Sequence, residues 1–105
     1  MKIAVLSKDR EALQQIRETL AANDSSNEIE LFEGALGRIL PLVEQEHPDL
    51  LIVDLGDEVT PDLRTLEPIA LRYPAMTIIL IYPKPTHEFL VQAIRIGVRE
   101  VLPSR

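Results

Sequence analysis

One carboxylate in this sequence stands where a protein could use it chemically. Asp54 ends an unbroken apolar run, residues 50–53, and this pattern is typical of a buried strand that carries an acid to the rim of a sheet. A carboxylate at such a position can accept a phosphoryl group or bind a metal ion only beside suitable partners. A divalent cation needs further acids, and an incoming anion needs a hydroxyl group and a lysine. The chemistry of Asp54 therefore depends on what the fold places next to it.

The other candidate metal ligands lack partners at ligand spacing. Asp9 could be a cation ligand, but its place before an amphipathic stretch is more typical of a helix N-cap. His47 and His87 have no second histidine or cysteine at metal-ligand spacing, so both are interpreted as exposed side chains. Asp57 and Glu58 could attract a cation, although an acidic surface loop is the simpler interpretation. The sequence contains no Gly-rich phosphate cradle and no Ser-His-Asp set.

Five short apolar runs must position these residues. They cover residues 3–6, 29–32, 50–53, 78–81 and 98–102. The first, third and fourth runs are apolar throughout, as expected of parallel strands covered on both faces, whereas charges interrupt the second and fifth. We therefore expect the second and fifth strands nearer the edges. The alternation of apolar runs with amphipathic stretches predicts an α/β domain with a doubly wound parallel sheet.

The stretches between the runs predict helices with recognisable ends. The first helix is expected to stop near Asn23. The second is expected to start near Ile39, because Pro41 is tolerated in the first turn of a helix but not deep inside one. In the fourth, Thr86 is a suitable N-cap and Gly97 a suitable terminator.

The third helix is expected to be short and irregular. Thr60 and Pro61 form a suitable cap and first-turn pair, and Pro68 then demands a kink or a break. The sequence shows no internal repeat and no linker, so residues 1–105 are interpreted as one domain.

Composition argues against several classes of function. The chain has 17 acidic and 11 basic residues and a formal charge of -6, which disfavours contact with nucleic acid or an anionic membrane. Cysteine is absent, so disulfides, thiolate metal sites and cysteine nucleophiles are excluded. The start is too short for a signal peptide, and no apolar run approaches the roughly 18 residues of a membrane span. A soluble cytoplasmic domain is expected.

Two segments resemble the receiver domains of response regulators. Residues 48–55, PDLLIVDL, resemble the third strand of that family, where the last acid is the phosphoacceptor, and residues 93–102, AIRIGVREVL, resemble its fourth helix and fifth strand. The resemblance spans nearly the whole chain, apart from the family's last helix, which is expected to be missing or to lie beyond this chain. It implies a flavodoxin or CheY-like sheet of five parallel strands in the order 2-1-3-4-5.

Most active-site positions implied by the resemblance carry other residues. Receivers place two acids after the first strand to hold Mg²⁺, and this sequence has Ser7 and Lys8 there, with Asp9 one step further. Receivers end the fourth strand with Ser or Thr, a position that falls on Tyr82. Their fifth strand is followed by a Lys-Pro pair, whereas this chain continues Pro-Ser-Arg, with Ser104 among the degenerate positions. The usual set is therefore reduced to its acceptor acid.

Asp54 can then be interpreted in two ways. It is either the phosphoacceptor of a two-component response regulator, with Mg²⁺ as cofactor, or a remnant carboxylate neutralised by Lys8, whose ammonium would take the place of the metal. We favour the second interpretation, which implies no metal, no cofactor and no catalysis. A third class of function, a small-molecule-binding domain that uses the crevice at the carboxyl ends of the strands, stays open.

One sub-family fits these departures better than a generic receiver. Residues 94–103, IRIGVREVLP, closely resemble the receiver-like N-terminal domain of Tad/Flp pilus assembly proteins of the TadZ/CpaE type. In that family an atypical receiver precedes a ParA/MinD-like ATPase domain and marks the cell pole or the site where the secretion machinery assembles. The sequence has no Walker-type motif, so an ATPase domain is expected beyond this chain or not at all, and the chain is interpreted as an N-terminal fragment.

The resemblance implies a module for protein interaction and localisation, without catalysis. Tyr82, Phe89, Arg95 and Arg99 are the interface candidates, because aromatic residues and arginine are favoured at interfaces. The alternative places Phe89 in the core and the arginines on a solvated rim. Without the last helix, part of the sheet would be uncovered, so a homodimer or docking onto a following ATPase domain is expected.

Overall fold

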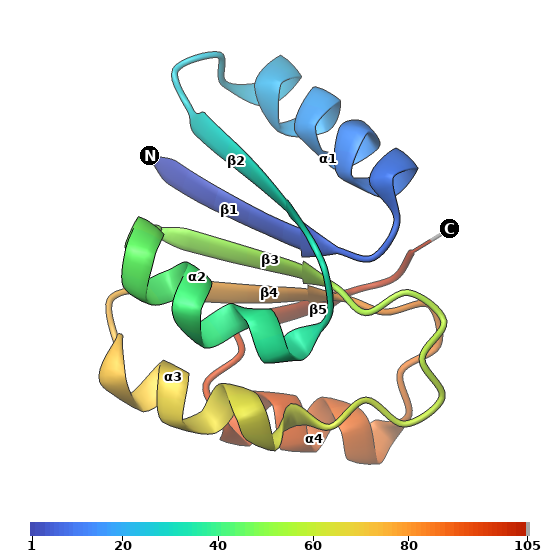
Figure 1. Ribbon diagram of the computed structural model, residues 1–105. Helices are drawn as coiled ribbons and strands as arrows, with labels where there is room; N and C mark the ends of the chain where they lie inside the picture. Colours follow the sequence, from blue (N-terminus) through green and yellow to red (C-terminus); the bar gives the residue numbers. More distant parts are fainter. Residues whose placement is uncertain (105) are drawn as a thin grey trace.

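The sheet has five parallel strands in the order β2-β1-β3-β4-β5 (Figure 1). The computed structural model describes residues 1–104. The strands are β1 (Lys2–Ser7), β2 (Glu28–Glu33), β3 (Leu50–Asp54), β4 (Thr77–Ile81) and β5 (Glu100–Leu102). The predicted strand order is confirmed, and the two runs interrupted by charges form the two edges.

Helices cover both faces of this sheet. The α-helices in residues 1–104 are α1 (Arg10–Asn23), α2 (Ile39–Glu46), α3 (Leu66–Arg72) and α4 (His87–Arg95), with two 3-10 turns, η1 (Leu36–Arg38) and η2 (Leu63–Thr65). Figure 1 shows α1 on one face of the sheet and α2, α3 and α4 on the other. The predicted doubly wound α/β fold is thus confirmed.

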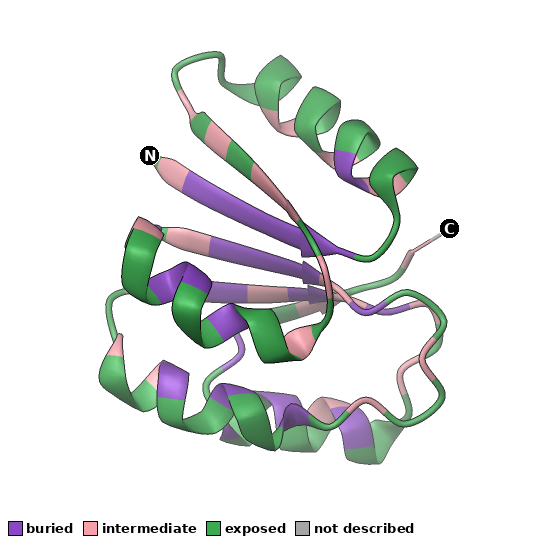
Figure 2. Cartoon of the chain, viewed as in Figure 1, coloured by how far each residue is buried: buried purple, intermediate pink, exposed green. Residues whose placement is uncertain are grey.

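Each face of the sheet buries its own aliphatic core. Successive side chains of a strand point to opposite faces, so the central strands contribute to both. On the α1 face, Leu13 packs with Ile3, Val5 and Ile52. The larger core on the other face is built from the inner sides of α2, α3 and α4 (Figure 2) and from Ala4, Leu6, Leu51, Val53, Ile78 and Leu80 of the strands. Burying one such aliphatic side chain contributes about 1.5–3 kcal/mol, so this packing stabilises the central strands that position the site.

Most of the predicted helix ends are confirmed. Asp9 caps α1, with its carboxylate accepting a hydrogen bond from the Glu11 amide at 2.9 Å. Thr86 caps α4 by accepting from the Phe89 amide at 3.1 Å. The α-helix α2 starts at Ile39, so its proline lies in the first turn as expected.

The predicted start of the third helix is wrong. Asp62, not the Thr60 and Pro61 pair, caps the first turn: its Oδ1 accepts a hydrogen bond from the Arg64 amide at 3.0 Å. The Arg64 guanidinium also donates to this carboxylate and, with the amide, lowers the pKa of Asp62 to about 2. Pro68 follows in the first turn of α3, after the 3-10 turn η2, so the expected break in this helix is confirmed.

Candidate functional site

A cleft of about 320 Å³ opens at the carboxyl ends of β1 and β3. Its walls come from the loops that follow β1, β2 and β3, which all leave the sheet at this edge (Figure 1). The lining residues are Leu6 to Asp9, Gly34 to Leu36, and Val53 to Glu58. Asp54 lies in this cleft, half-buried, at the end of β3. The rim position predicted for this acid is therefore where the structure places it.

Both oxygens of the Asp54 carboxylate accept hydrogen bonds from neutral donors. The Ser7 hydroxyl donates to Oδ2 at 2.8 Å, and the backbone amide of Gly56 donates to Oδ1 at 3.1 Å. Gly56 has a φ of +61°, a left-handed conformation that favours glycine and lets the chain turn back onto the acid. The sequence indicated the acid but not these two donors.

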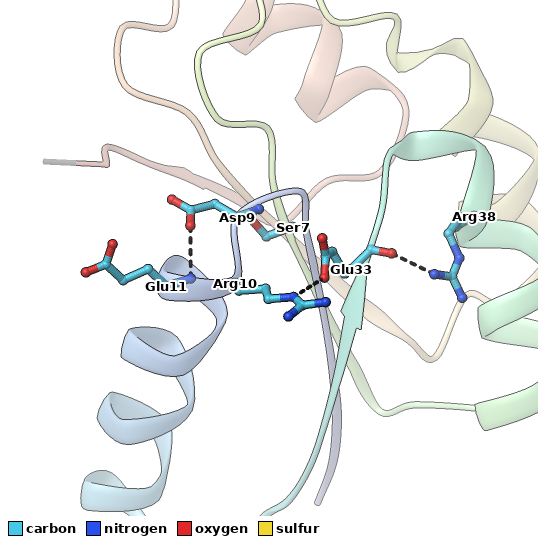
Figure 3. Close-up of polar contacts among 6 residues, drawn as sticks. All are labelled: Ser7, Asp9, Arg10, Glu11, Glu33 and Arg38. Carbon is cyan, nitrogen blue, oxygen red and sulfur yellow. Dashed lines mark hydrogen bonds and ion pairs between the residues drawn. The ribbon is translucent and has the colours of Figure 1, made fainter.

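Ser7 connects Asp54 to the start of α1. Its side chain is 1% exposed, and its Oγ accepts a hydrogen bond from the Asp9 amide at 3.0 Å while donating to Asp54. Figure 3 shows Ser7 beside Asp9, whose carboxylate turns toward the Glu11 amide of the first helical turn. One buried hydroxyl therefore joins β1, β3 and the cap of α1.

The Ser7→Ala variant is expected to lose about 1–3 kcal/mol of unfolding free energy, because it leaves the Asp9 amide and the Asp54 Oδ2 without their partner. Urea denaturation of both proteins measures this difference. Ser104→Ala is a matched control at a half-buried position outside the strands. An equal, small loss in both variants would contradict the role given to the Ser7 hydroxyl.

The predicted contact between Lys8 and Asp54 is wrong. Lys8 instead pairs with Glu58, with its Nζ 3.2 Å from Oε1. The physical reason is that each Asp54 oxygen already accepts a hydrogen bond, from Ser7 or Gly56, while the Glu58 side chain, 40% exposed in the loop after β3, offers Lys8 a carboxylate within reach. The ion pair joins the loop after β1 to the loop after β3 beside the acid. Lys8 is exposed, so this pair contributes no more than about 1 kcal/mol.

Tyr82 anchors the loop that follows β3. Its hydroxyl donates to the carbonyl oxygens of Glu58 and Val59, at 2.5 Å and 3.1 Å. Its ring stacks on Phe89 of α4, with centroids 4.8 Å apart and planes inclined by 30°. Tyr82 and Phe89 are each 9% exposed, so both belong to the core. They therefore do not lie on the exposed surface, where interface candidates were expected.

Tyr82→Phe is expected to loosen this loop while leaving the ring stack intact. The lost hydroxyl should reduce stability by about 0.5–1.5 kcal/mol and speed amide hydrogen exchange in residues 56–60. Hydrogen exchange followed by mass spectrometry measures the effect, with Tyr73→Phe, near the opposite ends of the strands, as the control. Unchanged exchange in the loop would show that Tyr82 does not hold it.

A second polar cluster, which sequence reasoning missed, lies at the end of β2. The Arg10 Nε donates to the Glu33 carboxylate at 2.7 Å, and the Arg38 guanidinium donates to the Glu33 carbonyl at 2.6 Å (Figure 3). The hydrogen bond that Arg10 donates to Glu33, together with the attraction between their charges, raises the pKa of the Arg10 guanidinium. The available signal was Glu33 directly after the second run, Arg38 a few residues later and Arg10 after the first run, but their pairing depends on how the loops turn.

The remaining candidate residues lie outside the cleft or at its edge. Arg95 and Arg99 are exposed, as the solvated-rim alternative expects. His87 starts α4 and is exposed. His47 is exposed too, and ends α2 in a left-handed conformation with φ of 47°, with its ring edge-on to Tyr73 at 6.4 Å. Within residues 1–104, no group of three or more His, Cys, Asp or Glu side chains could hold a metal ion.

A parallel sheet in this order, with an acid at the end of β3, is the arrangement of a CheY-like receiver domain, and comparison with solved structures supports this fold. CheY4 from Vibrio cholerae superposes with a TM-score of 0.78 over 98% of this chain and 85% of that chain, at 16% identity. No family model matches the sequence. A search of curated proteins gives no match either.

Two further structures carry names related to pilus assembly. A pilus assembly-related protein from Burkholderia pseudomallei and a CpaE pilus assembly protein from Burkholderia thailandensis both superpose with a TM-score of 0.82 at 24% identity. Each match covers 98% of this chain, and it covers 77% and 84% of those chains, respectively. At these identities the likeness shows a receiver-domain fold. None of the helices in residues 1–104 is long and apolar enough to span a membrane.

Proposed function

We propose that this chain is an atypical receiver domain that acts in protein interaction and localisation without catalysis or phosphorylation. The observation that carries this proposal is the bonding of Asp54. Both carboxylate oxygens are held by neutral donors of the chain itself, the Ser7 hydroxyl and the Gly56 amide. An acid with a hydrogen bond on each oxygen in a half-buried site acts as a structural link between strands, although each oxygen keeps a second lone pair.

The residues around Asp54 do not fit a magnesium ion. A small divalent cation prefers several oxygen ligands in near-octahedral geometry. Here the Ser7 hydroxyl donates to Asp54, and the Asp9 carboxylate accepts from the first turn of α1. The Lys8 ammonium forms an ion pair with Glu58 in the same cleft. The nearby cation is thus an ammonium that the chain supplies. We infer that the domain works without metal or other cofactor.

The pilus-related neighbours support a role in localisation. The two Burkholderia proteins are named for pilus assembly, and the resemblance of residues 94–103 to TadZ/CpaE proteins independently suggests the same class. We infer that the domain is cytoplasmic and positions a partner protein at the assembly site, as a homodimer or beside an ATPase domain. The expected polar position in the cell belongs to this same proposal.

Incubation with acetyl phosphate and Mg²⁺, followed by intact mass measurement, tests the absence of phosphorylation. The proposal expects the unmodified mass for the native chain and for Asp54→Asn alike, while a phosphorylatable receiver treated in parallel gains a phosphoryl group. A phosphorylated product in the native chain that disappears in Asp54→Asn would overturn the proposal.

One observation favours the second candidate, a phosphoacceptor response regulator. Because Lys8 pairs with Glu58 and not with Asp54, no ion pair within residues 1–104 neutralises the acid, and a cleft lies beside it. In that case Ser7 and Gly56 would have to release the carboxylate before it could attack a phosphoryl donor. The mass measurement separates the two candidates.

A further inference from the structure

The outer edge of β2 is the longer of the two edges at which the sheet ends. β2 has six residues, whereas β5 at the other edge has three. The Glu28 and Gly34 amides donate to carbonyl oxygens on the β1 side, at 3.0 Å and 2.9 Å, and the backbone groups of a strand alternate between its two sides. Ile29, Leu31 and Glu33 therefore turn their amides and carbonyls away from the sheet. An open edge of this kind is a template for a further strand.

Two arginines occupy outward carbonyls of this edge. The Arg17 guanidinium, from α1, donates to the Ile29 carbonyl at 3.3 Å. The Arg38 guanidinium, from η1, donates to the Glu33 carbonyl at 2.6 Å (Figure 3). Because α1 and η1 pack against opposite faces of the sheet, the two guanidiniums reach the edge from both sides. Of the three outward carbonyls of β2, that of Leu31 alone has no side-chain donor.

Gly34 makes room for the Arg38 side chain. A Cβ at Gly34 would overlap the Cδ atom of Arg38, so this arginine crosses directly over the glycine backbone to reach Glu33. Any larger residue at this position would push the flexible arginine side chain aside. Arg10 adds a second contact, since its Nε donates to the Glu33 carboxylate at 2.7 Å. The end of β2 is therefore held by one arginine from α1 and one from η1.

The glutamates of β2 oppose strand pairing in a different way. Glu28 and Glu30 are exposed and form no ion pair within residues 1–104. Between two β2 strands these carboxylates would repel one another, but about 1 M salt screens such repulsion beyond roughly 3 Å. The arginine hydrogen bonds are direct contacts with the backbone and do not depend on long-range charge. Salt therefore separates the two effects.

We propose that Arg17 and Arg38 close the edge of β2, so that the β2 strands of two copies of this chain do not pair. Centred on Leu31, an antiparallel pair would place Ile29 of each copy opposite Glu33 of the other and join two sheets across a two-fold axis. The carbonyls needed for this pairing already accept charge-assisted hydrogen bonds. This inference goes beyond the proposed function, because it concerns a surface that the fold keeps out of association.

Sedimentation velocity at about 1 M sodium chloride, together with amide hydrogen exchange followed by NMR, tests the proposal. Arg17→Ala combined with Arg38→Ala should raise the average mass above that of the native chain at equal concentration, and increasingly so as concentration rises. In the paired species the outward Leu31 amide should exchange roughly tenfold or more slowly than in the native chain. The Glu30 amide, which faces β1, should exchange slowly in both and so reports that the sheet is intact.

Two further variants isolate the cause of this association. Arg17→Ala combined with Gly34→Ala keeps the Arg38 charge but displaces its side chain, so this protein should associate as the first variant does. Arg64→Ala combined with Arg72→Ala removes the same charge from η2 and α3 and should behave as the native chain does.

Several results would overturn the proposal. It fails if neither edge variant gains mass, if the charge control gains as much, or if association leaves the Leu31 amide as fast as in the native chain. Rapid exchange of the Glu30 amide in the edge variants would also overturn it, because the arginines would then hold the strand itself rather than close its edge. None of these results depends on phosphorylation at Asp54, so failure here is distinguishable from failure of the proposed function.

Discussion

Replacing Phe89 with alanine is expected to destabilise the domain by about 3–5 kcal/mol, the range for truncating a buried aromatic side chain. Phe89 is 9% exposed and stacks on Tyr82, whose hydroxyl holds the loop beside Asp54. The truncation would leave a cavity beneath α4 and remove the ring that orients Tyr82. Urea denaturation gives the loss in unfolding free energy.

Ile94→Ala on the same helix is the matched control. Its side chain is 68% exposed, so the expected loss is below about 1 kcal/mol. The pair of variants separates the two roles considered for Phe89. A loss for Phe89→Ala as small as that for Ile94→Ala would contradict the core position and return Phe89 to the interface candidates.

Gly97→Ala is expected to cost about 2–4 kcal/mol, from two causes that act together. Gly97 has a φ of +105°, a conformation that residues with a Cβ rarely adopt. The added Cβ would also lie 3.1 Å from the Ala70 Cβ, so α3 and the turn after α4 would have to separate. Thermal unfolding and urea denaturation should both show the loss.

The control is Gly37→Ala in η1, where an added Cβ meets no atom within 4 Å. That variant should be neutral or slightly more stable, because alanine restricts the unfolded chain more than glycine does. Combining Gly97→Ala with Ala70→Gly should recover part of the loss by relieving the contact. No recovery would assign the whole cost to the backbone conformation.

The fold could be predicted from local patterns because the residue types in each strand indicate whether the strand lies at the centre or at the edge of the sheet. The runs at residues 3–6 and 50–53 are apolar throughout, and they form β1 and β3 at the centre of the sheet, with helices on both faces. The run at residues 29–32 contains Glu30, is flanked by Glu28 and Glu33, and forms the edge strand β2. Helix ends followed local chemistry in the same way, as the caps Asp9 and Thr86 show.

The candidate site could be predicted only in part, because its contacts join loops that are distant in sequence. Asp54 was identified from a single run, but its donor Ser7 lies 47 residues away. Lys8 was assigned to the wrong acid because charge alone does not tell Glu58 from Asp54 when both lie in one cleft. The anchoring of the loop by the Tyr82 hydroxyl carries no local signal, since its acceptors are backbone carbonyls.

The same limit applies to the start of the third helix. Thr60 and Pro61 form a good local cap and first-turn pair, yet Asp62 takes this role because its carboxylate reaches both the amide and the guanidinium of Arg64. Two competent capping sequences lie within three residues of each other. Local capping preference alone does not distinguish them.

The most direct test of the central claim is the ¹⁵N spectrum of the domain with and without beryllofluoride and Mg²⁺, which together mimic a phosphorylated aspartate. The bonding of Asp54 to Ser7 and Gly56 predicts that amide shifts of the loops after β1 and β3 stay unchanged, as in Asp54→Asn treated in the same way. Saturable shifts in these loops and in α4, present in the native chain and absent in Asp54→Asn, would contradict the account and identify a functional phosphoacceptor.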